Sequence, residues 1–134
     1  MEWNDGDYKI SDDKSLISLD KVCELLSKSY WAAQRPKEKN ELAIKNSVCY
    51  GVYYKAEQIG YARLVTDFCT VYWLCDVIID ETFRGKGLGK KLIECIVESD
   101  EFKDKCGILG TKDAHGLYEK YGFKKYPERF MCNK

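Results

Sequence analysis

The sequence predicts a single α/β domain, spanning residues 1–134, with a mixed but mostly antiparallel sheet and helices on both faces. Three apolar and aromatic runs, 48–55, 58–66 and 71–80, are joined by connections too short for a crossover helix, which requires antiparallel pairing. A glycine-rich loop and an amphipathic helix from Leu88 follow the third run. That helix leads to a short apolar run at 106–111, which is therefore parallel to the third strand. We expect six to seven strands and about four helices.

The N-terminal third is predicted to contain one strand and two helices. Alternating polar and apolar residues favour a strand within residues 2–13. Apolar residues recur at helical spacing from Leu19 to about Ser29, and Ser18 is a suitable N-cap. Pro36 suits the first turn of a second, shorter helix that reaches Ile44.

The rest of the sheet is predicted from composition and from turn lengths. The runs 48–55 and 58–66 form a hairpin without the Asn-Gly pair that is typical of a tight turn. The run 71–80 is apolar on both faces, and we expect it at the centre of the sheet. A helix is expected at 114–121, and edge strands at 123–126 and 129–132 flank Pro127.

Composition narrows the class of protein. Lys plus Arg and Asp plus Glu number 22 each, so the net charge gives no support for binding nucleic acid or an anionic membrane. No apolar stretch is long enough to span a bilayer, and the N-terminal residues lack the basic-then-apolar pattern of a signal peptide, so we expect a cytoplasmic protein.

Seven cysteines raise the question of disulfides or a metal. Their number is odd, no C-x-x-C pair occurs, and His115 is the only histidine, so the ligand spacing of a zinc site is missing. We expect no metal and interpret the cysteines as free thiols in a reducing compartment, mostly buried within strands and helices.

The segment 84–91, Arg-Gly-Lys-Gly-Leu-Gly-Lys-Lys, lies where a buried strand turns into a helix. Unpaired N–H groups and the helix dipole make such a position suitable for phosphate, and glycine lets the phosphate approach the backbone. The spacing fits neither the Walker A loop nor the dinucleotide fingerprint. We interpret it as a pyrophosphate cradle with added positive charge from its lysines and arginine.

Two motifs resemble those of a known superfamily. Arg84, Gly87 and Gly89 fill the pattern R-x-x-G-x-G, directly after the strand end 77–80. Downstream, the segment 114–123 is similar to A-x-x-L-Y-E-K-x-G-F. Both patterns, in this order, resemble the GNAT N-acetyltransferase superfamily.

The resemblance implies a fold, a reaction and a co-substrate. It implies that acetyl-CoA is the co-substrate of a transferase (an acyltransferase) that acetylates a primary amine of a small-molecule acceptor by direct attack in a ternary complex. It also implies that the strands 71–80 and 106–111 splay apart around the pantetheine arm. Thr111 occupies a position where the family often has asparagine. The residues expected to bind the cofactor are Val77, Ile78, Ile79, Arg84, Gly85, Lys86, Gly87, Leu88, Gly89, Lys90 and Thr111.

The candidate catalytic residues are Tyr118 and Asp76. The resemblance implies that Tyr118 protonates the leaving thiolate; core packing is the alternative. It also implies that the backbone N–H of Ile78 or Ile79 polarises the acetyl carbonyl. Asp76 is a carboxylate in an apolar strand, and strand alternation places it on the opposite face from Cys75 and Val77. It could be the general base, an anchor for the amine, or an ion-pair partner of Arg63. Alternatively, water could carry the amine proton to bulk solvent, and no general base from the protein would then be needed.

The segment between the first two helices is expected to border the acceptor. Trp31 and Arg35 are the candidate substrate-binding residues, whereas Tyr30 continues the apolar stripe and is expected in the core. The resemblance also implies a possible homodimer through the C-terminal edge strands, a habit of the family. Two other functions stay open: a non-catalytic module that binds CoA, and a protein or peptide N-acetyltransferase.

Overall fold

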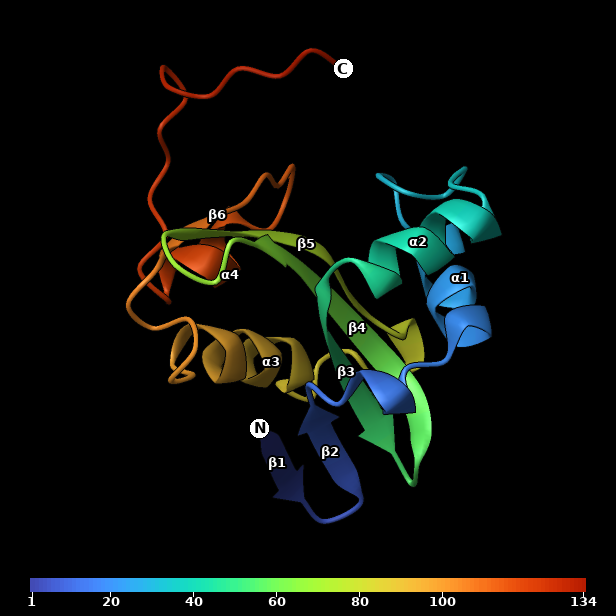
Figure 1. Ribbon diagram of the computed structural model, residues 1–134. Coiled ribbons are helices and arrows are strands. Elements are labelled where there is room, and N and C mark those ends of the chain that lie inside the picture. Colours follow the sequence, from blue (N-terminus) through green and yellow to red (C-terminus); the bar gives the residue numbers. More distant parts are fainter.

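Six strands form one sheet in which every strand lies beside its neighbour in the chain, in the order β1 to β6. The computed structural model describes residues 1–134 (Figure 1). None of the helices combines the length and the apolar character that crossing a bilayer requires. The elements are β1 (Glu2–Asp5), β2 (Tyr8–Ser11), α1 (Leu19–Ser27), α2 (Lys37–Lys45), β3 (Val48–Tyr54), β4 (Glu57–Thr66), β5 (Val71–Ile79), α3 (Leu88–Val97), β6 (Cys106–Ile108) and α4 (His115–Glu119).

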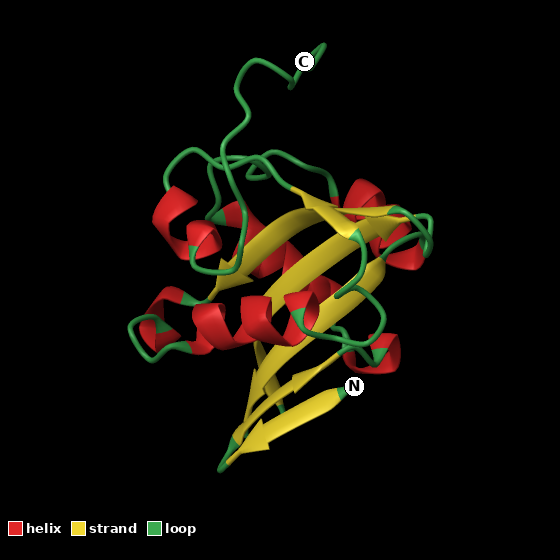
Figure 2. Cartoon of the chain, turned by 90° about the vertical axis from the view of Figure 1, so that its left-hand side faces the viewer, coloured by secondary structure: helices red, strands yellow, loops and turns green.

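Helices cover both faces of the sheet, as the sequence predicts. Helices α1 and α2 lie on one face, and α3 and α4 lie on the other (Figures 1 and 2). The apolar stripe of α3, including Leu92 and Ile96, packs with Tyr72 and Leu74 of β5 in the larger core. The stripe of α1 packs with Ile78 of β5 in the smaller one. Strand β5 is therefore buried from both sides, which explains its nearly continuous apolar sequence.

The position of β5 in the sheet differs from the prediction. It is the fifth of six strands rather than the central one, and it pairs antiparallel with β4 and parallel with β6. An apolar strand indicates that helices cover its faces and does not fix its number of neighbours. Pairing with β6 includes only Val71–Trp73, so the rest of this edge of β5 has no strand partner.

Two tight turns shape the antiparallel part of the sheet. The predicted single N-terminal strand is a hairpin, because Gly6 adopts a positive φ of 58° and reverses the chain between β1 and β2. The predicted β3–β4 hairpin is confirmed, with Lys55 and Ala56 as its two turn residues. Their φ angles of 49° and 67° give the left-handed turn that the right-handed twist of the strands requires.

A β-bulge interrupts the pairing of β4 with β5. The register runs from Tyr61 opposite Ile78 to Arg63 opposite Cys75, so two residues of β5 oppose Ala62. Within the bulge, Asp76 has a φ of 53°, which is unusual for a residue other than glycine. The bulge shifts the alternation of side chains along the second half of β5.

The chain after α4 contains no strands, so the predicted edge strands 123–126 and 129–132 are wrong. The C-terminal end of this segment extends away from the sheet (Figure 2). Its aromatic residues pack individually instead: Phe123 against Tyr118, with ring centroids 5.9 Å apart, and Phe130 against Trp73 at 5.5 Å. Their apolar character reflects these contacts rather than a strand.

Candidate active site

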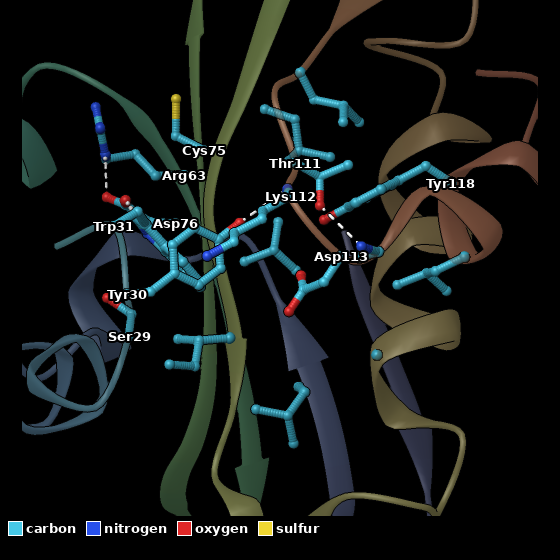
Figure 3. A pocket seen from close by; sticks show the side chains of 18 of the residues that line it. Ser29, Tyr30, Trp31, Arg63, Cys75, Asp76, Thr111, Lys112, Asp113 and Tyr118 are labelled. Carbon is cyan, nitrogen blue, oxygen red and sulfur yellow. Dashed lines mark hydrogen bonds and ion pairs between the residues drawn. The ribbon is translucent and has the colours of Figure 1, made fainter. Parts of the chain in front are cut away.

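A cleft of about 1140 Å³ opens where β5 and β6 separate. Pairing of the two strands ends at Trp73 and Ile108, and the cleft continues along the free edge of β5 as far as the glycine loop. The expectation that these strands splay apart agrees with this geometry. The β6–α4 connection forms the opposite wall, and the α1–α2 connection covers one end (Figure 3).

The glycine loop forms the other end of the cleft. None of the six backbone N–H groups from Gly85 to Lys90 donates to an acceptor within the protein. Gly87, the N-cap of α3, has a φ of 79°, and a Cβ atom there would meet nothing within 4 Å. The loop therefore presents a row of free donors at a helix N-terminus, an arrangement that suits a phosphate or pyrophosphate group.

The cationic residues of this loop differ in their placement. Lys90 lines the cleft, and Arg84 also lines it while its Nε donates to the carbonyl oxygen of Ile79 at 3.0 Å. That bond ties the loop to the end of β5. Lys86, which the sequence predicts to bind the cofactor, is exposed and is not among the lining residues. Of the other residues predicted to bind the cofactor, all line the cleft: Val77, Ile78, Ile79, Gly85, Gly87, Leu88, Gly89 and Thr111.

Tyr118 extends from α4 into the cleft. Its side chain is buried, yet its hydroxyl has no hydrogen-bond partner within the protein and points toward the space beside Thr111 (Figure 3). Burial raises the pKa of Tyr118 to about 12, so the phenol keeps its proton at neutral pH. A buried, protonated hydroxyl that faces a cleft can donate a proton to a leaving group there.

The connection between β6 and α4 is held by two hydrogen bonds. The Thr111 hydroxyl accepts from the backbone N–H of Ala114 at 3.0 Å and so supports the first turn of α4. The Tyr30 hydroxyl accepts from the backbone N–H of Lys112 at 3.0 Å. Tyr30 is therefore not in the core as predicted: it is 56% exposed and bridges the two walls of the cleft.

Asp76 is the centre of a polar cluster beneath the α1–α2 connection. Its carboxylate accepts from Trp31 Nε1 at 3.0 Å and from Arg63 Nε at 2.9 Å (Figure 3). It also accepts from Arg35 Nη1 and Nη2 at 2.8 and 3.2 Å. The ion pair with Arg63 is one of the three roles considered from the sequence. Trp31 and Arg35 line the cleft as predicted, but both also contact Asp76.

The expectation that Asp76 and Cys75 point to opposite faces is wrong. Arg63 lies opposite Cys75 in the register, on the same face, and yet contacts Asp76. The bulge is the physical reason, because it turns two consecutive side chains toward α1 and α2. The carboxylate thus reaches two arginines that alternation alone would place on the other side of the sheet.

The environment of Asp76 keeps it ionised. Burial by itself would raise the pKa of this carboxyl, but the hydrogen bonds and charges of Arg35 and Arg63 outweigh burial and lower the pKa below its ordinary value. A carboxylate whose oxygens already accept from four N–H groups is a poor proton acceptor. This geometry gives no support to Asp76 as the general base.

The cysteines are free in the structure, but they are less buried than predicted: Cys49 is buried, whereas Cys69, Cys106 and Cys132 are exposed. Cys75 lines the cleft, and burial raises the pKa of its thiol to about 11, which disfavours the nucleophilic thiolate. No group of three or more His, Cys, Asp or Glu side chains is arranged to hold a metal.

Sequence reasoning missed three features of the site. The sequence predicts Arg63 only as a partner of Asp76, although it also lines the cleft. It predicts Tyr30 in the core and gives Cys75 no role in the site, yet both line the cleft. For Tyr30, the sequence offers one signal: it stands beside Trp31 in the connection between two helices, and residues of connections often bind ligands.

Several known proteins are similar to this chain in both sequence and fold. The family model for the acetyltransferase (GNAT) domain matches residues 45–125. FG08082 of Gibberella zeae, named as an acetyltransferase, is 28% identical to this chain over 96% of this chain and 85% of its own length.

Two solved structures extend the comparison. A protein of Xanthomonas campestris pv. campestris assigned to the GNAT family superposes with a TM-score of 0.89 at 30% identity, covering 95% of this chain and 92% of that one. A GNAT-family acetyltransferase from Elizabethkingia anophelis, solved with acetyl-CoA bound, has the same fold at a TM-score of 0.67 and 20% identity, covering 90% and 78% of the two chains. The match to the family model, the shared fold and the two motifs around the cleft lead to one assignment: this chain belongs to the GNAT family of acetyltransferases.

Proposed function

We propose that this protein transfers an acetyl group from acetyl-CoA to the primary amine of a small acceptor, by direct attack in a ternary complex. The observation that carries the proposal is the row of free N–H groups from Gly85 to Lys90, beside Arg84 at the mouth of the cleft. Such a cradle fits the pyrophosphate of CoA, and the free edge of β5 fits an extended amide-containing arm. When bound, acetyl-CoA supplies the activated thioester.

The free edge of β5 offers a donor for a developing oxyanion. The backbone N–H of Asp80 donates to Ile59 on β4 at 2.7 Å. Because successive N–H groups of a strand point to opposite edges, that of Ile79 faces the cleft and that of Ile78 faces β4. Of the two candidates from the sequence, Ile79 is therefore favoured as the group that polarises the acetyl carbonyl.

Tyr118 is proposed as the general acid. Its pKa of about 12 lies well above that of a thiol, about 8.5, so its hydroxyl is protonated when the thiolate leaves. Its hydroxyl has no competing partner within the protein. If Tyr118 served only to pack in the core, phenylalanine would be sufficient at this position.

Water relayed to bulk solvent is proposed as the route for the proton of the amine. Asp76 and Asp113 are the only carboxylates that line the cleft; Asp76 is fully occupied by its arginines, and Asp113 is exposed at the rim beside Lys112. Cys75, with its raised pKa, holds its proton. The acceptor therefore has to arrive as the neutral amine or lose its proton to water.

Calorimetric titration with acetyl-CoA tests the proposal. The Gly87→Trp variant places an indole in the open space of the cradle and should abolish binding. Gly6→Trp is the matched control, because Gly6 also has a positive φ and open space around it but lies in the β1–β2 turn, away from the cleft. Absence of binding by the native protein, or equal binding by both variants, would remove the basis for the proposal.

Two other functions make different predictions. A non-catalytic CoA-binding module would show the same calorimetry but no acetyl transfer to any amine. A protein or peptide N-acetyltransferase would prefer peptides to small amines in a single-turnover screen. A homodimer stays a proposal from the family resemblance, and the C-terminal strands that would mediate it are absent from this structure.

A further inference from the structure

The end of the cleft beneath the α1–α2 connection carries excess positive charge. Arg35 and Arg63 contribute two positive charges there, and Asp76 contributes one negative charge, which leaves one positive charge uncompensated. At the rim, the exposed residues Lys28, Lys112 and Asp113 also line the cleft and together add one more net positive charge. The cluster lies at the opposite end from the glycine loop, so the proposed phosphate cradle does not account for it.

The two guanidinium groups retain unused donors. Arg63 gives Nε to Asp76 and Nη1 to Ser47 Oγ at 3.2 Å, but its Nη2 has no hydrogen-bond partner within the protein. Both Nη atoms of Arg35 donate to Asp76, and its Nε likewise has no hydrogen-bond partner within the protein. Neither free nitrogen is among the fully buried unpaired atoms, which are only the hydroxyls of Tyr50 and Tyr53. These donors therefore remain accessible, although the two side chains are only 20% and 14% exposed.

Asp76 fixes this arrangement rather than offering a site for a cation. An ammonium group would have to displace an arginine from its carboxylate and would still meet the other one. An oxyanion, by contrast, can accept from the guanidinium nitrogens that Asp76 leaves unpaired, without displacing either arginine. The bulge brings Asp76 to this face, where it holds both arginines and leaves Nε of Arg35 and Nη2 of Arg63 unpaired.

We propose that the acceptor amine carries an anionic group, a carboxylate or a phosphate, that binds the free donors of Arg35 and Arg63. The proposal rests on the proposed acetyl transfer and specifies its acceptor class. It disfavours polyamines and lysine-rich peptides, whose further positive charges would be repelled by this end of the cleft. Trp31, which donates to Asp76 within the same cluster, is a reporter for the site.

Binding of anions can be measured without any turnover. Inorganic phosphate and glutarate are titrated separately into the CoA-saturated protein at constant ionic strength, while the indole N–H resonance of Trp31 is followed by ¹H–¹⁵N NMR. CoA occupies the cradle and prevents the anions from binding there. We expect at least one anion to give a saturable shift, and spermidine to give none.

Variants identify the residues that bind the anion. Arg63→Met should weaken anion binding about tenfold to hundredfold, the loss expected for hydrogen bonds to a charged group. Arg35→Gln is the second variant if Arg63→Met does not fold. Lys39→Met is the matched control, since it removes one exposed positive charge of α2 outside the cleft. A linear shift that is the same in all these proteins would overturn the proposal.

A panel of matched amines tests the acceptor class directly. Each pair differs by an anionic group: an amino acid and its amide, 4-aminobutyrate and 1,4-diaminobutane, an amino sugar phosphate and the amino sugar. We expect the anionic member to have a kcat/KM higher by about tenfold or more. Preference for the neutral or cationic members would refute the acceptor class while leaving acetyl transfer in place. Anion binding at Trp31 without turnover of any amine would instead support the site and count against the proposed function.

Discussion

Arg63 Nε donates to Oδ2 of Asp76 at 2.9 Å across a bulge that sets two residues of β5 against one of β4. The carboxylate is 3% exposed and holds a second arginine, Arg35, at 2.8 Å. These contacts connect the α1–α2 connection to the sheet. The stability of the protein and the charge of the cleft therefore both depend on Asp76. This dependence is the basis of the first two predictions.

Asp76→Asn should lower the free energy of unfolding by about 3 kcal/mol, because removing one partner of a buried ion pair leaves the other charges uncompensated. Urea denaturation of the two proteins measures the difference. Asp20→Asn is the control, since its ion pair with Lys37 is on the exposed surface and should contribute nothing measurable. Full stability of Asp76→Asn together with loss of turnover would restore the base role of this carboxylate.

Stability should also fall in acid through Asp76. Its pKa in the folded state is lower than in the unfolded state, so the unfolded chain binds the proton more tightly. Its contribution is therefore complete above the unfolded-state pKa of about 4 and is lost as the pH falls through the lower folded-state value. Melting temperatures of the wild type and Asp76→Asn should converge below pH 4. A constant gap down to pH 2 would contradict this assignment.

Tyr118→Phe should reduce kcat about 100-fold while leaving the affinity for acetyl-CoA unchanged, because it removes a proton donor and retains the ring that packs in the core. Single-turnover kinetics and calorimetry measure the two quantities. Tyr121→Phe is the control: it removes a partly buried tyrosine hydroxyl near the same core but outside the cleft lining. Equal kinetics for both variants would assign Tyr118 to packing.

The alkaline limb of the pH–rate profile follows from the raised pKa of Tyr118, about 12. The rate should rise as the acceptor amine loses its proton and should show no decline up to pH 10, because the general acid remains protonated throughout. A decline centred between pH 8 and 10 in a protein that is still folded would indicate a different acid.

Two substitutions in the β3–β4 turn should make the protein more stable. Lys55 and Ala56 both adopt the left-handed conformation, which costs a residue with a Cβ about 1 kcal/mol or more. The double change Lys55→Asn and Ala56→Gly supplies the residues preferred in such a turn and should raise the free energy of unfolding by about 1 kcal/mol. Thermal and urea denaturation test this, and the turn is outside the cleft lining, so activity should not change.

Much of the fold and one end of the cleft were predictable, because their signals are local. The helix at Leu88–Val97, the hairpin of β3 and β4 and the glycine cradle each depend on residues close together in the chain. The strands expected after Tyr121 failed for the opposite reason: their aromatic residues contact Tyr118 and Trp73, and only the folded chain shows those contacts.

The sequence by itself determined the strand–glycine loop–helix unit, the tyrosine of α4 and the family to which both motifs belong. These depend on local spacing, since a helix that begins at glycines offers free N–H groups to an anion wherever it lies in a fold. The tertiary structure alone decided the contacts of Asp76 and the charge at the end of the cleft beneath the α1–α2 connection. Those depend on a bulge and on contacts with Trp31 and Arg35, which are 45 and 41 residues away in the chain. Strand alternation cannot reveal them, because one extra residue in β5 reverses the face to which every later side chain points.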